Sequence, residues 1–172
     1  DAAIIAVGYA AGLRRAELAG LTLADVTDKG DNIELAVRGK GNKERTAYLT
    51  NGAAAALRDW IRIRGDNAGP LFYRGRRGGH LVRGKGLTPQ AIRDIILRRA
   101  DQAKVRDVTP HDLRRSCVSD LLDAGVDIKT VADLVGHENV QTTARYDRRP
   151  EARKRKAADT LHVPYMGRTL AT

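Results

Sequence analysis

The sequence predicts a mainly α-helical domain that carries a small antiparallel β-sheet, an α+β fold. Apolar residues recur at helical spacing in several segments of the 172-residue chain, as on the buried face of a helix. Residues 32–38 and 46–49 alternate between apolar and polar, which is typical of strands with one buried face. Threonine–proline pairs at 88–89 and 109–110 stand where helices commonly begin.

The first part of the chain is expected to hold two helices followed by a β-hairpin. Apolar residues from Ile4 to Ala11 follow a helical pattern, Gly12 interrupts it, and a short helix restarts at 16–19. The segment R-G-K-G-N-K-E between the two alternating stretches contains two glycines and an asparagine. It therefore predicts a hairpin whose tip carries Lys40 and Lys43.

The middle of the chain predicts three more helices and a basic, glycine-rich segment. One helix is expected over 53–64. The segment 74–86 is interpreted as a mobile loop or an irregular hairpin. Thr88 and Thr109 are each followed by proline and start the next two helices, and Asp112 completes a variant of the capping box with Thr109.

The last part of the patterned sequence is typical of two short helices joined by a tight turn. The first is expected over 128–135 and ends at Gly136, and the second begins within 139–146, as in a helix-turn-helix. A final basic helix is expected from Pro150 to about Leu161.

Domain organisation is inferred from this pattern. Residues 1–149 are predicted to form one domain, and residues 150–172 a C-terminal basic helix and tail. The chain begins with Asp1 inside an apolar helical pattern. We therefore expect a further N-terminal part to precede it.

Composition favours a partner that carries many negative charges. Lys and Arg number 31 against 21 Asp and Glu, a formal net charge of +10 with a pI near 10.2. Nucleic-acid phosphates suit this balance, and a merely basic soluble protein is the alternative. The single cysteine, Cys117, excludes a disulfide framework and a cysteine-based metal site. Without a long apolar run or a signal peptide, we expect a cytoplasmic protein with no membrane partner.

Basic residues at one helix start form a candidate phosphate-binding group. His111 and Arg114 lie three residues apart and share a helical face, and the helix start offers free backbone N–H groups to an anion. Arg115, four residues after His111, fits that face equally well. Taken alone, each of these residues is more often structural or solvated.

Two further cations lie close to glycines in the sequence. Arg14 stands at the helix restart, where a guanidinium can bind two phosphate oxygens, and Glu17 can orient it by an ion pair. Lys40 at the hairpin tip can bind phosphate or donate a proton to a departing oxygen, and Lys43 is the alternative.

A histidine and a tyrosine complete the candidate set. His137 follows a glycine at a turn, where it can donate to a phosphoryl oxygen or cap the helix. Tyr146 is one of five tyrosines. A phenol becomes a nucleophile when its proton is drawn off or its oxyanion is stabilised, which Arg145 and the histidines can do. A buried structural tyrosine is the alternative.

Two other kinds of site are rejected. The segment G-H-L-V-R-G-K at 79–85 matches the start of a nucleotide-binding phosphate loop, but Gly86 stands where Ser or Thr is needed. A metal site is not expected, because the histidines lie in different elements without a carboxylate cluster.

In this order and with these flanks, the residues resemble the catalytic domain of the tyrosine recombinases. This integrase superfamily includes the phage integrases and the Xer recombinases. The resemblance rests on G-L-R-x-x-E-L, G-K-G-N-K-E-R, H-D-L-R, and L-x-G-H followed by T-T-x-x-Y, and it spans nearly the whole chain. It implies the fold of that family and site-specific breaking and rejoining of DNA without a cofactor or metal.

The resemblance also assigns roles that the residues alone left open. Tyr146 attacks the scissile phosphate to form a 3′-phosphotyrosyl link, and Lys40 protonates the leaving 5′-oxygen. Glu17 matches the acidic partner of the first arginine. His111 either assists proton movement at the tyrosine or donates to the phosphate. The residues implied to be catalytic are Arg14, Lys40, His111, Arg114, His137 and Tyr146.

The implied partner is double-stranded DNA that carries a recombination site. Members of the family usually have an N-terminal DNA-binding domain and assemble as homotetramers on two paired sites, so we expect this chain alone to be a monomer. The helix at 150–161 is the candidate for docking on a neighbouring subunit, with Leu161 and Val163 as anchors. Candidate DNA contacts, chosen for their basic character, are Lys43, Arg45, Arg76, Arg77, Arg83, Lys85 and Arg145.

Two alternative functions use the same features. A type IB topoisomerase shares a similar set of residues but relaxes supercoils as a monomer. A DNA-binding regulator would use the helix-turn-helix-like segment 127–146 without catalysis, and would not need Tyr146.

Overall fold

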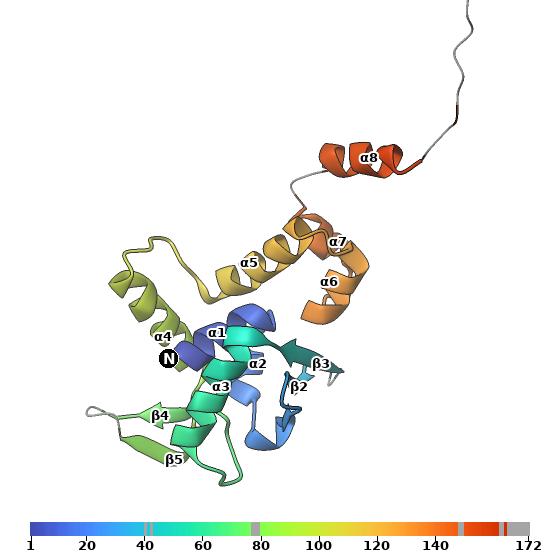
Figure 1. The fold of residues 1–172 in the computed structure, drawn as a ribbon. Helices are drawn as coiled ribbons and strands as arrows, with labels where there is room; N and C mark the ends of the chain where they lie inside the picture. Colours follow the sequence, from blue (N-terminus) through green and yellow to red (C-terminus); the bar gives the residue numbers. More distant parts are fainter. Residues whose placement is uncertain (40, 42, 77–79, 148–149, 162–163, 165–172) are drawn as a thin grey trace, which may run out of the picture.

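Helix α1 lies at the centre of the fold, in contact with α2, α3, α5 and β3 (Figure 1). The structure is a computed structural model that describes residues 1–39, 41, 43–76, 80–147, 150–161 and 164. Its helices are α1 Ala2–Ala10, α2 Arg15–Gly20, the 3-10 turn η1 Leu23–Asp25, α3 Asn51–Arg64, α4 Pro89–Gln102, α5 Pro110–Asp123, α6 Ile128–Val135, α7 Val140–Ala144 and α8 Pro150–Asp159. Its strands are β1 Val26–Asp28, β2 Ile33–Arg38, β3 Glu44–Leu49, β4 Tyr73–Gly75 and β5 Leu81–Gly86. The predicted α+β fold is confirmed.

Strands β1, β2 and β3 form an antiparallel sheet in that order. Ile33 pairs with Leu49 and Leu35 with Ala47, and all four side chains are buried. The Gly39 N–H donates to the Lys43 carbonyl oxygen at 2.8 Å and closes the β2–β3 turn. The predicted hairpin is therefore confirmed. Strand β1 was not predicted, because three residues are too few to show an alternating pattern.

The described residues of the basic segment 74–86 form an irregular hairpin, one of the two predicted alternatives. Strand β4 pairs antiparallel with β5, and the register shifts between Tyr73 and Arg74. This second, two-stranded sheet lies well apart from α6 and α7 (Figure 1).

Side-chain caps fix the helix starts that the threonines predicted. The Thr88 hydroxyl accepts from the Ala91 N–H at 3.1 Å. At α5, the backbone N–H and the hydroxyl of Thr109 both donate to one carboxylate oxygen of Asp112, at 2.7 and 2.6 Å. Both helix starts and the capping box are thus confirmed. Helix α3 begins at Asn51, two residues before the predicted start.

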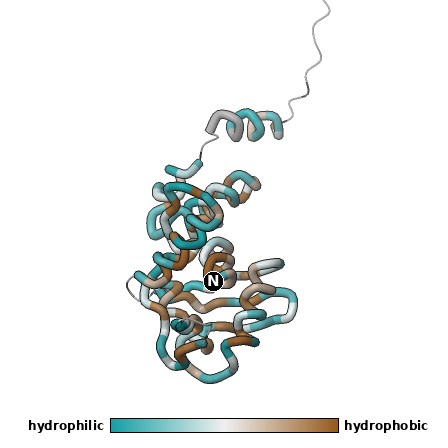
Figure 2. Tube along the Cα trace, turned by 90° about the vertical axis from the view of Figure 1, so that its left-hand side faces the viewer, coloured by the Kyte–Doolittle hydropathy of each residue, from teal (hydrophilic) through white to brown (hydrophobic). Residues whose placement is uncertain are grey.

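Two hydrophobic clusters hold the elements together. The larger combines buried residues of α1, β2, β3, α3 and α4, including Val7, Leu35 and Leu57. The smaller lies between α5 and α6, around Val118 and Val131. Figure 2 shows the hydrophobic residues gathered in the body of the molecule, whereas α8 is mostly hydrophilic and stands apart. Within the described ranges, no helix combines the length and the apolar character that crossing a membrane requires.

Candidate active site

Arg14 and Glu17 form an ion pair at the candidate site. Arg14 is the N-cap residue of α2 in an extended conformation. Its backbone N–H donates to Glu17 Oε2 at 2.9 Å, and its guanidinium Nη1 donates to Oε1 at 2.7 Å. Burial alone would raise the pKa of Glu17, but the bonds from Arg14 and the nearby Arg45 outweigh it and hold that pKa below its usual value. The carboxylate therefore stays ionised and fixes Arg14, as the spacing predicted.

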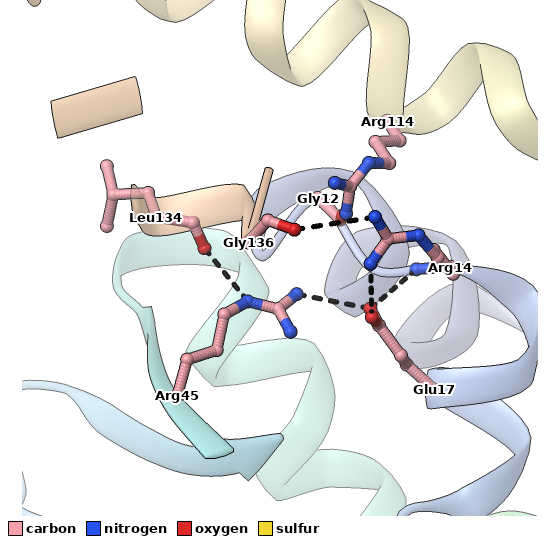
Figure 3. Close-up of polar contacts among 7 residues, drawn as sticks. All are labelled: Gly12, Arg14, Glu17, Arg45, Arg114, Leu134 and Gly136. Carbon is pink, nitrogen blue, oxygen red and sulfur yellow. Dashed lines mark hydrogen bonds and ion pairs between the residues drawn. The ribbon is translucent and has the colours of Figure 1, made fainter. Parts of the chain in front are cut away.

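Arg45 links this carboxylate to the end of α6. Its Nη2 donates to Glu17 Oε2 at 3.1 Å, and its Nε donates to the carbonyl oxygen of Leu134 at 3.1 Å (Figure 3). Only 13% of its side chain is exposed. Two of its three guanidinium nitrogens thus act inside the protein. The DNA contact expected of Arg45 stays a prediction. The contacts in the structure show that Arg45 holds Glu17 and the end of α6 in place.

Arg114 enters the site from α5 and is almost completely buried, with 2% of its surface exposed. Its Nη1 donates to the carbonyl oxygen of Gly12 at 2.6 Å, whereas its Nη2 has no hydrogen-bond partner among the described residues. Burial and the charge of Arg14 lower the pKa of Arg114 to about 10. A buried cation with an unused donor is costly unless an anion is to occupy the space.

A second buried arginine shows that this arrangement is not general in the fold. Arg64 is 0% exposed, and its guanidinium lies 4.7 Å from the ring centroid of Tyr73. It donates to the carbonyl oxygens of Gly65, Asn67, Gly69 and Pro70. Arg64 is therefore a structural clamp on its own loop, whereas Arg114 keeps a donor for something else.

Glycines at two positions allow the elements to approach closely. Gly12 has φ +56°, and a Cβ there would lie 2.7 Å from the Val135 side chain. Gly136 has φ +69°, and a Cβ there would lie 3.1 Å from Arg45 Cδ. A side chain at Gly12 would push the end of α1 away from α6 and displace the carbonyl group that Arg114 contacts. A side chain at Gly136 would push the end of α6 away from Arg45 and displace the carbonyl group that Arg14 contacts.

His137 follows the left-handed residue that ends α6, as predicted. The N–H of His137 donates to Ala132 O and that of Gly136 to Asp133 O, which together form a Schellman motif. Its Nδ1 lies 2.7 Å from the hydroxyl of Thr143. Burial, followed by the charges of the neighbouring arginines and His111, lowers the pKa of His137 to about 4. At neutral pH the ring is therefore uncharged.

Tyr146 lies in the turn after α7 and packs against the smaller hydrophobic cluster. Its hydroxyl is 3.5 Å from His111 Nε2, a long hydrogen bond that a small movement would shorten. The Arg115 guanidinium lies 6.0 Å from the centroid of the Tyr146 ring, and the His137 ring stacks 6.5 Å away. The structure thus brings Tyr146 together with both histidines.

Two open grooves meet at Arg14. One, of about 610 Å³, lies between the β2–β3 hairpin and the α6–α7 turn, and its lining includes Lys43 and His137. The other, of about 390 Å³, runs between α2, α4 and α5 and is lined in part by Arg15, Arg93 and His111. The second groove is thus lined by basic side chains without an acidic one, whereas the first combines Lys43 and Arg45 with the acidic Glu44, Asp133 and Glu138. Arg15 and Arg93 were not among the predicted DNA contacts, because only the tertiary packing brings α2 and α4 together.

The remaining predicted site residues are distributed as follows. Lys40 and Arg77 lie outside the described residues. Lys43 Nζ is 2.9 Å from a carboxylate oxygen of Glu138, and Arg145 is exposed beside Tyr146. Three of the predicted DNA contacts, Arg76, Arg83 and Lys85, are exposed on the β4–β5 hairpin, apart from the candidate site. Among the described residues, no group of three His, Cys, Asp or Glu side chains could hold a metal ion.

Comparison with known proteins identifies the family. The family model described as "Phage integrase family" matches residues 1–153. The tyrosine recombinase XerC of Chromohalobacter salexigens is 38% identical over 169 residues, which cover 94% of this chain and 52% of XerC. XerC of Corynebacterium glutamicum is 35% identical over 165 residues, 94% of this chain and 51% of XerC. The chain thus spans about half the length of the curated relatives it matches.

Solved structures share the fold. The crystal structure of XerA recombinase has a TM-score of 0.70 at 28% identity and covers 95% of this chain and 58% of XerA. The post-cleavage complex of XerH has a TM-score of 0.72 at 24% identity, over 91% of this chain and 44% of XerH. With the matched motifs and the geometry above, these findings confirm the resemblance: the chain belongs to the phage integrase family of tyrosine recombinases.

Proposed function

We propose that this chain is the catalytic part of an enzyme for site-specific DNA recombination, which cuts and rejoins strands through a 3′-phosphotyrosyl intermediate. The observation that carries this proposal is the buried Arg114, whose unused Nη2 lies in a cluster with Arg14 and His137. Arg114 forms no ion pair with a carboxylate of the described chain, so a phosphate is the anion that suits this position. Tyr146 and His111 supply the nucleophile and the proton acceptor next to it.

The first step is a transfer of the phosphoryl group from DNA to the enzyme. Tyr146 Oη attacks the phosphorus atom, the bond from phosphorus to the 5′-oxygen breaks, and the phenolic proton passes to His111 Nε2. Arg14 and Arg114 stabilise the negative charge on the non-bridging oxygens, and a neutral His137 donates a hydrogen bond to one of them. The resemblance allows two roles for His111, and in this mechanism it carries the proton of the tyrosine.

The same cleavage step needs a proton for the leaving 5′-oxygen, and Lys40, assigned by its place in G-K-G-N-K-E-R, supplies it. The second half of the reaction restores the phosphodiester bond. The 5′-hydroxyl of a partner strand attacks the phosphotyrosine and gives its proton to Lys40, while the bond from phosphorus to Tyr146 Oη breaks and His111 returns a proton to Tyr146. Each step exchanges one phosphate ester bond for another, so the energy of the phosphodiester is kept and the reaction needs no nucleotide.

The partner in this proposal is duplex DNA with a recombination site. The XerH relative was crystallised on its difH substrate and the λ integrase relative as a dimer on a core site. We propose that the full-length protein acts as a homotetramer on two paired sites, with α8 docking on a neighbouring subunit. Leu161, one predicted anchor of that contact, is 77% exposed, and Val163 lies outside the described residues.

Covalent trapping on DNA of mixed sequence tests the proposal. Full-length protein is incubated with sheared genomic DNA of its host, denatured and digested, and the peptide that carries a residual nucleotide is identified by mass spectrometry. We expect the nucleotide on Tyr146 and no adduct from Tyr146→Phe. Tyr48→Phe is the matched control, because Tyr48 is 51% exposed on β3 and outside the site. An adduct on another residue would contradict the proposal.

Sequencing of the trapped DNA separates the alternative functions. For a recombinase, the trapped DNA fragments share one site, and two plasmids that each carry this site are joined in a recombination assay. A type IB topoisomerase would relax a supercoiled plasmid without joining two molecules, and a regulator would retain the DNA without any covalent adduct. Either of the last two results would overturn the proposal.

A further inference from the structure

Thr143 contacts two of the predicted catalytic residues at once. Its side chain is 0% exposed, and its hydroxyl lies 2.7 Å from His137 Nδ1. Its backbone carbonyl oxygen accepts the N–H of Tyr146 at 3.0 Å. One residue therefore connects the phosphate-binding histidine to the turn that carries the nucleophile.

The burial of this hydroxyl follows from the packing of α7. Asn139 caps the helix by accepting from the Gln141 N–H at 2.8 Å, and α7 then packs against α6. Thr142, the preceding residue, is exposed, whereas Thr143 is fully buried. A buried hydroxyl requires a hydrogen-bond partner, and His137 supplies it.

The bond to Thr143 decides which ring nitrogen of His137 can serve a phosphate. A neutral imidazole has one N–H and one bare nitrogen, and a threonine hydroxyl can donate or accept. If the hydroxyl donates to Nδ1, the ring proton lies on Nε2, which can then donate to a phosphate oxygen. If the hydroxyl accepts, Nε2 is a bare lone pair and would repel that oxygen.

The surroundings of His137 keep its ring neutral, so the choice of tautomer matters. Arg14 from α2, Arg45 from β3, and Arg114 and His111 from α5 act on it, and burial together with these charges lowers its pKa to about 4. The stacked Tyr146 ring covers another side. A doubly protonated ring, which would donate from both nitrogens without help, is therefore not available at neutral pH.

We propose that Thr143 is a positioning residue that donates its hydroxyl proton to His137 Nδ1 and so holds the proton of the ring on Nε2, toward the phosphate. The same residue sets the turn of Tyr146 through its carbonyl group. The use of Nε2 rests on the proposed function, whereas the tautomer itself does not.

The tautomer can be measured without DNA. Full-length protein labelled with ¹⁵N in histidine gives long-range ¹H–¹⁵N spectra that distinguish a protonated from a bare ring nitrogen, and His137→Asn identifies the signals of His137. We expect a bare Nδ1 and a protonated Nε2, and a mixture of tautomers in Thr143→Val. A protonated Nδ1 in the wild type, or an unchanged spectrum in Thr143→Val, would overturn the proposal.

Activity provides the second readout. Thr143→Val keeps the branched shape and removes the hydroxyl, whereas Thr143→Ser keeps the hydroxyl, and Gln141→Ala is the exposed control on the same helix. We expect Thr143→Val to slow covalent complex formation by about 10- to 100-fold with unchanged DNA affinity, and the other two to stay within about threefold. Equal losses in Thr143→Val and Thr143→Ser would mean that only packing matters and would refute the role of the hydroxyl.

These two experiments fail in different ways. A wild-type protein that forms no covalent complex would disprove the proposed function, while the spectra would still decide the Thr143–His137 tautomer. Expected spectra together with normal activity of Thr143→Val would show that the tautomer is set but unimportant, and would refute the positioning role.

Discussion

The guanidinium of Arg114 donates to the carbonyl oxygen of Gly12 at 2.6 Å, across 102 residues of sequence. This bond joins the first turn and a half of α5 to the end of α1, next to the N-cap residue of α2. It fixes the direction of the guanidinium and leaves Nη2 without a partner in the described part of the chain. The candidate phosphate position is therefore built where α1, α2 and α5 meet.

Replacing the two buried arginines should affect stability in opposite ways. Arg114→Met removes a poorly compensated buried cation, and we expect the free energy of unfolding to stay level or rise by about 1 kcal/mol while covalent complex formation is lost. Arg64→Met removes a guanidinium whose donors are all used, and should lower the free energy of unfolding by about 3 kcal/mol. Urea denaturation of both variants tests this. A strongly destabilised Arg114→Met would show that the residue is mainly structural.

Glu17→Gln should destabilise the protein in a pH-dependent manner. The folded-state pKa of Glu17 lies below its ordinary value of 4.5. Its ionic contribution is therefore complete above that value and is lost as the pH falls through the lower folded pKa. We expect a loss of about 2 kcal/mol at pH 7 that shrinks below pH 4.5. Denaturation curves across this range, with Glu34→Gln on β2 as control, test it. A loss that is independent of pH would contradict the ionic role.

Arg45→Met should reduce activity although Arg45 is not one of the predicted catalytic residues. Its bonds to Glu17 and to Leu134 O position Arg14 and the turn before His137. We expect covalent complex formation to slow by about 10- to 100-fold. Arg45→Lys should form the covalent complex about as slowly as Arg45→Met, because one ammonium group cannot replace the two directed hydrogen bonds of the guanidinium. Arg38→Met on the neighbouring strand, with 61% of its side chain exposed, should remain near wild type.

Gly136→Ala should combine a stability loss with an activity loss. Its positive φ and the close Arg45 side chain oppose a Cβ, and we expect about 1–2 kcal/mol of destabilisation. Gly84→Ala is the matched control, because Gly84 has φ +77° in open space and is far from His137 in sequence. It should lose about 1 kcal/mol but keep normal cleavage. Equal activity of the two variants would mean that the turn before His137 tolerates displacement.

The groove between α2, α4 and α5 should contribute to DNA affinity. Arg15 and Arg93 are exposed along it. We expect Arg15→Gln and Arg93→Gln each to weaken binding to all sequences alike and to reduce the slope of log affinity against log salt by about 1. Arg62→Gln on α3 lines neither groove and should change nothing. Titrations at several salt concentrations test this, and equal slopes in all three variants would exclude a phosphate contact in this groove.

Local patterns in the sequence were enough to predict the fold class, most element boundaries and the family. Capping residues such as Thr109 and Asp112 act within a single turn, and the left-handed Gly136 ends α6 for a reason local to its backbone. Alternation along β2 and β3 likewise reflects burial of one face of a strand. Rules of this kind are visible in one stretch of sequence, and so these predictions hold in the structure.

What each basic residue faces, by contrast, became visible only in the folded chain. Spacing on a helix could not separate Arg114 from Arg115, because both share a face with His111. In the fold, Arg114 is buried against Gly12 and Arg115 is exposed beside Tyr146. The positions of Arg45 and Thr143 were likewise hidden, since their partners lie on other elements or beyond a turn. Burial and hydrogen bonding depend on contacts between segments far apart in the chain, and no local pattern records them.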